Sequence, residues 1–231
     1  VSEKAIYTMQ EEGVDLIELG VPFSDPAADG PVIQRADERA LAQGVDIFKV
    51  FELVRKIRNN VEVPMVFLLY YNVMVQYGIE KFFKCCQETG VDGLIIPDLP
   101  YEESDEIKEY TEKYGVYQIS LVSPTSKDRI KNIAKDAKGF LYCISSLGVT
   151  GEKSSFVTNF DEFVGTIKKY TDVPACVGFG VSNGRQVKEL TKYFDGAIVG
   201  SAIVKSIATG ESVEERINNL REKIKDLKSG L

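Results

Sequence analysis

The chain has 231 residues, a length typical of one compact domain. It carries 28 Lys and Arg against 35 Asp and Glu, a net charge of −7, so the basic surface of a nucleic-acid-binding protein is not expected. It contains no histidine, which excludes Ser-His-Asp and Cys-His nucleophile pairs and His-ligated zinc or iron sites. Acid–base chemistry therefore falls to carboxylates, Tyr, Lys or Cys.

The predicted elements alternate along the chain. A first amphipathic helix covers Ser2–Glu12. Seven short apolar runs are predicted as buried strands: Leu16–Leu19, Met65–Tyr71, Gly93–Pro97, Tyr117–Val122, Phe140–Ile144, Ala175–Gly178 and Gly196–Val199. Amphipathic helices are predicted between them at Ile47–Ile57, Ile79–Thr89, Glu103–Tyr114, Lys127–Ala137, Asp161–Tyr170 and Gly184–Tyr193. The charged and apolar tail from Glu211 to Leu231 is predicted to form a closing helix.

This alternation predicts an α/β fold with parallel strands and right-handed crossovers. A (β/α)8 TIM barrel has eight strands and begins with one, whereas this chain shows seven and begins in a helix. We therefore predict a (β/α)8 barrel whose first strand is missing from the chain, with residues 1–231 forming a single, N-terminally incomplete barrel domain. The alternative is an open, doubly wound sheet of seven strands.

Two carboxylates fall where a barrel carries its active site. Glu18 interrupts an apolar strand near its carboxyl end, and Asp29 lies in the Pro- and Gly-rich loop that follows. A carboxylate placed there is costly to desolvate unless it is hydrogen-bonded or used in chemistry, and burial moves its pKa toward the range of a general acid. The alternative is that Glu18 points outward and that Asp25 and Asp29 form a turn or cap the next helix.

Two glycine clusters follow the last two strands. Gly178-Phe179-Gly180 follows the penultimate strand, and Gly200-Ser201 opens the helix after the last one. Backbone N–H groups in these loops of a barrel often hold a phosphate, so the pair predicts a phosphate site even in an acidic protein. The alternative is that both clusters are tight turns.

Further polar residues stand at other strand ends. Tyr142 precedes a loop of small residues that continues to Asn159, and we predict this loop to be a mobile lid. The Tyr142 hydroxyl either enters the pocket or packs in the sheet. Asn72 and Asp98 also end strands, and we favour turn and network roles for both. The four cysteines, Cys85, Cys86, Cys143 and Cys176, have no CxxC spacing, which indicates reduced thiols in a cytoplasmic protein.

These motifs together resemble the α subunit of tryptophan synthase, over essentially the whole chain. The matching segments are ELGVPFSDPxADGP at Glu18–Pro31, YxN at Tyr70–Asn72, PDLPxEE at Pro97–Glu103, GVTG at Gly148–Gly151, GFGV at Gly178–Val181 and GSAIVK at Gly200–Lys205. The resemblance implies a lyase of tryptophan biosynthesis that cleaves indole-3-glycerol phosphate to indole and glyceraldehyde 3-phosphate by retro-aldol chemistry. It makes Glu18 the general acid–base and Asp29 the carboxylate that assists at the indole N–H.

The resemblance also implies the binding residues and the partner. The phosphate would lie at Gly151, Gly180, Gly200 and Ser201, the indole against Leu68, Ile95 and Leu121, and Tyr142 near Glu18. No metal or organic cofactor is expected in this subunit, because pyridoxal phosphate belongs to the β subunit of an α2β2 heterotetramer. Loops 22–34 and 146–160 would couple the two subunits. The alternatives are a stand-alone lyase that releases indole and an inactive scaffold that only binds the β subunit.

Overall fold

The computed structural model describes residues 1–144, 159–178 and 180–231. By its contacts the chain divides into two compact units, the first made of residues 1–118 and 204–224 and the second of residues 119–203 and 225–231. Each unit contains one four-stranded sheet in which all paired strands are parallel. This agrees with the predicted alternation of strands and crossover helices.

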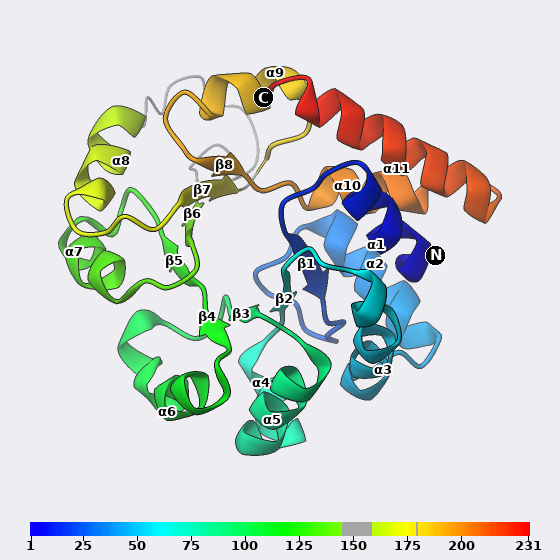
Figure 1. The fold of residues 1–231 in the computed structure, drawn as a ribbon, viewed down its shortest axis with the longest axis horizontal. Coiled ribbons are helices and arrows are strands. Elements are labelled where there is room, and N and C mark those ends of the chain that lie inside the picture. Colours follow the sequence, from blue (N-terminus) through cyan, green and yellow to red (C-terminus); the bar gives the residue numbers. More distant parts are fainter. Residues whose placement is uncertain (145–158, 179) are drawn as a thin grey trace. The chain divides into compact units, whose positions relative to one another are not determined.

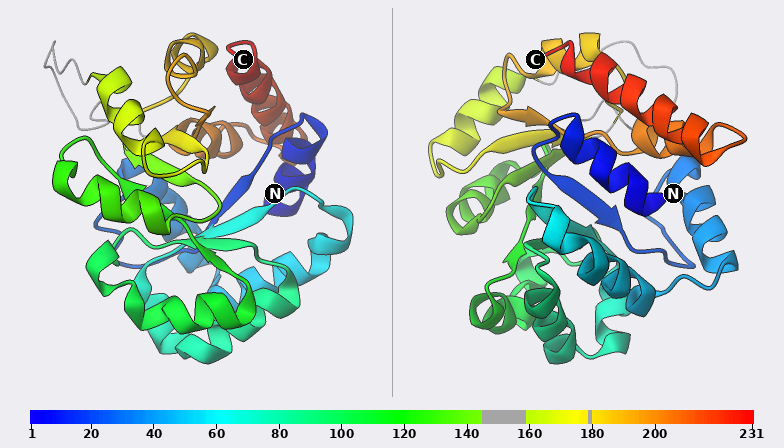
Figure 2. Two further views of the ribbon diagram at one scale, coloured as in Figure 1. Left: turned by 60° about the vertical axis from the view of Figure 1, so that its left-hand side comes forward. Right: turned by 45° about the vertical axis from the view of Figure 1, so that its right-hand side comes forward.

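The first unit holds the β1-β2-β3-β4 sheet. Its elements are α1 (Ser2–Glu11), β1 (Ile17–Gly20), α2 (Pro31–Ala42), α3 (Ile47–Ile57), η1 (Arg58–Asn60), β2 (Met65–Leu68), α4 (Tyr71–Tyr77), α5 (Ile79–Thr89), β3 (Gly93–Ile95), η2 (Tyr101–Glu103), α6 (Asp105–Tyr114) and β4 (Tyr117–Gln118). In Figure 1 the helices α3, α5 and α6 follow one another along the outer side of this sheet. Figure 2 shows α1 running beside β1.

The second unit holds the β5-β6-β7-β8 sheet. Its elements are β5 (Ser120–Val122), α7 (Lys127–Asp136), β6 (Leu141–Ile144), α8 (Phe160–Lys168), β7 (Ala175–Gly178), α9 (Gly184–Leu190) and β8 (Gly196–Ala197). Helices α7 and α8 lie along the outer side of β5, β6 and β7 (Figure 1). Helices α10 (Ser201–Ala208) and α11 (Val213–Lys228) belong partly to each unit.

Alternation along the strands of the first unit decides which side chains enter its main core. Every second strand residue faces the helices, and these residues join one buried cluster with the apolar stripes of α3 and α5. The cluster includes Ile17, Met65, Phe67 and Leu94 from the strands and Val50, Phe51, Val54, Phe82 and Phe83 from the helices. The intervening strand residues point to the opposite face of the sheet.

A carboxylate ties the beginnings of neighbouring strands together in both units. Asp92, just before β3, accepts hydrogen bonds at Oδ2 from the Met65 N–H (2.8 Å) and from Arg58 (2.9 Å). Asp195, just before β8, accepts them in the same way from the Ala175 N–H (2.7 Å) and Lys168 (2.6 Å). In each unit the aspartate accepts one hydrogen bond from the first N–H of the preceding strand and another from a cationic side chain at the end of a neighbouring helix. Asp92 and Asp195, the residues just before β3 and β8, therefore have structural roles.

The structure departs from the sequence prediction at the end of β2. The predicted strand Met65–Tyr71 stops at Leu68, and Tyr71 and Asn72 begin α4 instead of ending a strand. The cause is Asp98, after β3, whose Oδ1 accepts a hydrogen bond from the Tyr71 N–H at 2.9 Å and so supports the first turn of α4. The network role favoured for Asp98 is thus the one observed.

One predicted strand corresponds to two short ones. The run Tyr117–Val122 contains β4 and β5, which pair in different sheets and are separated by Ile119. Helices α2 and α4 were not predicted. Both begin at the end of a motif that the sequence pattern assigns to a loop or to a strand end. The other predicted helices agree with the structure to within a few residues, and α3 and α5 have the predicted bounds.

Candidate active site

Glu18 lies on the face of the first sheet that points away from the helix-packed core. Its backbone pairs with Val66 of β2, while its neighbours Ile17 and Leu19 face the core cluster. The Glu18 Oε1 atom is buried and has no hydrogen-bond partner in the part of the chain that the structure describes. Desolvation by burial raises the pKa of this carboxyl from 4.5 to about 7. A carboxyl with such a pKa can both give and accept a proton near neutral pH.

Two of the predicted indole contacts share this face. Leu68 pairs with Gly20 of β1 and with Ile95 of β3, so Leu68 and Ile95 stand side by side two residues beyond the level of Glu18. Ile95 is buried and Leu68 half-buried. The sequence therefore places one carboxyl beside an apolar surface, the surroundings in which a charged carboxylate is least favourable.

Asp29 is held by a tyrosine that follows β2. The Tyr70 hydroxyl donates a hydrogen bond to Asp29 Oδ2 at 2.8 Å and accepts one from the Ala28 N–H at 2.9 Å. The N-cap of α2 is Gly30, so the interpretation of Asp29 as a helix cap is wrong. Burial raises the pKa of Asp29, and the hydrogen bond from Tyr70 opposes that shift.

A second carboxylate on α2 lies within electrostatic range of Asp29. Burial and the charge of Asp29 together raise the pKa of Asp37 to about 6. The Asp29 main-chain oxygen also accepts a hydrogen bond from Gln34 Nε2 at 2.8 Å, so α2 contacts the loop directly. The Asp29 region is thus shaped by the loop, by Tyr70 and by α2.

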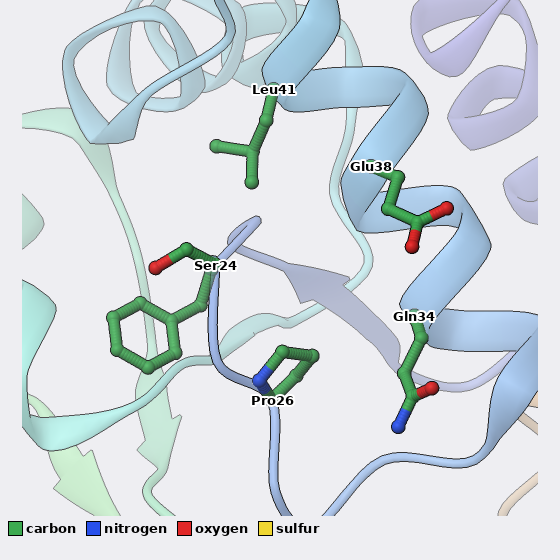
Figure 3. Close-up of a pocket in the computed structure, with 6 residues that line it drawn as sticks. Ser24, Pro26, Gln34, Glu38 and Leu41 are labelled. Carbon is green, nitrogen blue, oxygen red and sulfur yellow. The ribbon is translucent and has the colours of Figure 1, made fainter.

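A small pocket opens between this loop and α2. It has a volume of about 140 Å³ and is lined by Phe23, Ser24, Pro26, Gln34, Glu38 and Leu41. Figure 3 shows Ser24 and Pro26 on the loop and Gln34, Glu38 and Leu41 on the neighbouring helix α2. Neither Glu18 nor Asp29 lines it.

In the second unit, two predicted binding residues share one face of the sheet. Leu121 of β5 pairs with Tyr142 of β6, and Tyr142 pairs with Cys176 of β7. The Tyr142 ring passes over Gly178, where an added Cβ would collide with the ring and its hydroxyl. Gly178 is therefore needed to leave room for Tyr142, a role that the sequence analysis did not foresee.

The late glycines follow neighbouring strands. Gly180, with φ of +81°, comes after β7, and Gly200 with Ser201 comes after β8 at the start of α10. The two strands stay paired to this point, since the Ile198 N–H donates to the Val177 oxygen at 2.7 Å. All three residues are exposed, and the space that a Gly200 side chain would fill is open. Gly151 and almost all of the loop 146–160 lie outside the described residues.

Among the described residues no group of three or more Cys, Asp or Glu side chains is arranged to hold a metal ion. Nor does any helix within the described ranges have the length and apolarity needed to cross a membrane.

Comparisons with known proteins identify the family. The family described as Tryptophan synthase alpha chain matches residues 1–231. The Tryptophan synthase alpha chain of Alkaliphilus metalliredigens is 47% identical over 227 residues, which cover 97% of this chain and 85% of the relative. This chain belongs to the tryptophan synthase alpha chain family.

Solved structures agree with the tryptophan synthase assignment. Tryptophan synthase subunit alpha from Campylobacter jejuni is 40% identical and superposes with a TM-score of 0.87, covering 98% of this chain and 89% of that one. A chain of the tryptophan synthase complex from Pyrococcus furiosus is 32% identical, also with a TM-score of 0.87, covering 99% and 91% of the two chains.

Family membership confirms several sequence predictions. The fold class is the (β/α)8 barrel of tryptophan synthase alpha chains, not the open doubly wound sheet. The chain is a lyase of tryptophan biosynthesis, and the stand-alone and inactive alternatives are not favoured.

Three residues of the candidate site were missed by sequence reasoning. Tyr70 is the first residue of the YxN motif, so the motif match could have marked its hydroxyl as a candidate site group. Asp37 belongs to none of the matched motifs, and Gly178 was predicted as part of the phosphate-binding glycine cluster, not as the residue that makes room for Tyr142. The interactions of all three are with residues far away in the sequence or on another element, which local patterns do not report.

Proposed function

We propose that Glu18 is the general acid–base and Asp29 the carboxylate at the indole N–H in the cleavage of indole-3-glycerol phosphate. The observation that supports this most strongly is Glu18 Oε1, which is buried and has no hydrogen-bond partner among the described residues, in a carboxyl whose pKa burial raises to about 7. A protein keeps such a group at a cost in stability, and active sites are where that cost is commonly found.

The two carboxyl groups fit the steps of a retro-aldol cleavage. Protonated Glu18 delivers its proton to C3 of the indole ring, and Asp29 stabilises the positive charge that this places on the ring N–H. The hydroxyl on the carbon attached to C3 then loses its proton, the bond from C3 to that carbon breaks, and an aldehyde forms. The electron pair of that bond returns to the ring, which leaves as indole, and Glu18 is the base that accepts the hydroxyl proton.

The remaining predicted residues supply binding. Leu68 and Ile95 offer an apolar surface on the face that carries Glu18, and we assign Leu121 and Tyr142 to indole and substrate contacts on the second sheet. We assign the phosphate to the backbone N–H groups at Gly151, Gly180, Gly200 and Ser201. An exposed Gly180 with positive φ and a helix that begins at Ser201 are features suited to an anion.

We further propose that this chain carries out its reaction with side chains alone and hands indole to a β subunit. Pyridoxal phosphate would then be held by that β subunit in an α2β2 heterotetramer. The similarity to a chain of the Pyrococcus furiosus tryptophan synthase complex supports this partner. The loop 22–34, which lines the pocket against α2, is one of the two segments we assign to the contact. A biosynthetic role and four free thiols favour a cytoplasmic location.

The test replaces Glu18 with Gln and measures indole release with and without β subunit. Glu18→Gln should abolish turnover while substrate binding remains measurable, because the amide keeps the shape but cannot transfer the proton. The control is Glu52→Gln, which changes an exposed carboxylate on α3 and should leave turnover unchanged. Near-normal turnover by Glu18→Gln would contradict the assignment.

A further inference from the structure

Tyr70 holds both ends of the loop that carries Asp29. Its hydroxyl donates to Asp29 Oδ2 at 2.8 Å and accepts from the Ala28 N–H at 2.9 Å. At the other end of the loop, the Phe23 ring stacks on the Tyr70 ring with centroids 5.0 Å apart and an interplanar angle of 23°. One side chain therefore binds the loop through a carboxylate, a backbone amide and an aromatic ring.

The backbone that carries Tyr70 is itself anchored to the sheet. The Leu69 N–H donates to the Ile95 oxygen at 3.1 Å, and the Tyr71 N–H donates to Asp98 at 2.9 Å. Tyr70 is only 6% exposed, so its ring has little freedom to move. A rigid donor of this kind fixes the direction of the acceptor that it meets.

We propose that Tyr70 is a positioning residue for the lyase reaction, orienting Asp29 so that this carboxylate meets the substrate as a hydrogen-bond acceptor. This inference rests on the role proposed above for Asp29. An O–H donor stabilises the charged carboxylate over the neutral acid, because only the former is purely an acceptor.

The donor matters because the surroundings of Asp29 oppose its charge. Burial raises the pKa of Asp29, and burial together with the charge of Asp29 raises the pKa of the nearby Asp37 on α2. Burial first, and then the hydrogen bond to Asp29 and the charges of Asp29 and Asp98, raise the pKa of the Tyr70 hydroxyl, which therefore stays a donor. Among these groups Tyr70 is the one whose hydrogen bond lowers the pKa of Asp29.

The test is Tyr70→Phe in the full chain, assayed together with β subunit. Phenylalanine keeps the ring that stacks on Phe23 and removes only the hydroxyl. The matched control is Tyr71→Phe, since the adjacent Tyr71 hydroxyl also donates to a carboxylate, that of the exposed Glu106, at 2.6 Å. Two quantities are measured: the kcat and KM of cleavage, and the titration midpoint of the Asp29 carboxyl carbon by NMR.

Tyr70→Phe should raise the Asp29 midpoint and lower kcat about 10- to 100-fold, with a smaller change in KM, as expected for losing a hydrogen bond to a charged group. Tyr71→Phe should change neither quantity. An unchanged Asp29 midpoint in Tyr70→Phe would overturn the inference, and so would equal effects in the two variants.

Failure of the proposed function gives a different pattern. If Asp29 has no role in the reaction, Asp29→Asn retains normal turnover, even though Tyr70→Phe still shifts the Asp29 midpoint. The positioning inference, by contrast, fails when Asp29→Asn is inactive but the midpoint does not respond to the loss of the Tyr70 hydroxyl.

Discussion

The carboxyl of Glu18 should make this chain less stable as the pH rises. Its pKa is about 7 in the folded chain against 4.5 for the ordinary value. The folded state therefore binds the proton more tightly than the unfolded state does, and stability is lost as the pH rises from about 4.5 through 7. At about 1.4 kcal/mol per pKa unit, this difference is worth about 3 kcal/mol, all of it lost above pH 8.

Glu18→Gln removes this pH dependence. The amide cannot ionise, so the variant's free energy of unfolding does not fall with pH in this way. The free energy of unfolding of the variant minus that of the native chain should therefore be up to about 3 kcal/mol larger at pH 8 than at pH 4.5. Burying the amide instead of the acid also changes the free energy of unfolding, but by the same amount at every pH. The prediction therefore concerns how the difference in unfolding free energy between variant and native chain varies with pH. It is measured by urea unfolding in steps from pH 4.5 to 8.5.

The exposed Glu52→Gln provides the control for this experiment. Its unfolding free energy should follow that of the native chain at each pH, because Glu52 is solvated in both states. A difference between Glu18→Gln and the native chain that does not vary with pH would refute the reasoning. It would mean that water or a rearranged side chain satisfies the Glu18 carboxylate in solution.

Three other predictions concern the carboxylate of Asp92 before β3, the glycine beneath the Tyr142 ring and the phosphate site. Asp92→Ala should lower the free energy of unfolding by about 1–3 kcal/mol, because it removes the acceptor of the Met65 N–H and of Arg58 Nη2; chemical unfolding measures this, and a neutral result would show that water replaces the carboxylate. Gly178→Ala should displace the Tyr142 ring and reduce kcat/KM, which steady-state assays detect, whereas unchanged kinetics would remove Tyr142 from the site. Glycerol 3-phosphate should protect the backbone amides at Gly180 and Ser201 from hydrogen exchange, and protection confined to another surface would contradict the phosphate assignment.

Local patterns were sufficient for most of the secondary structure. The apolar stripe of α3 is visible in the sequence, and the helix has the predicted bounds. The structure adds the N-cap, Asp46, whose side chain accepts a hydrogen bond from the Lys49 N–H. Period-two alternation in β1 likewise separates Glu18 from Ile17 and Leu19. The pattern could not show that β2 ends at Leu68, because Asp98, which supports the first turn of α4, comes 27 residues after Tyr71.

The sequence by itself determined the parallel α/β alternation, the family and the two carboxylates, since each is written in periodicity or in a contiguous motif. The tertiary structure decided what those carboxylates are. The pKa of Glu18 rises to about 7 because folding buries its carboxyl, with Oε1 lacking a hydrogen-bond partner among the described residues, and Asp29 accepts a hydrogen bond from a tyrosine 41 residues away. The ionisation and direction of a side chain depend on the solvent and dipoles around it, and these surroundings exist only once distant segments pack together.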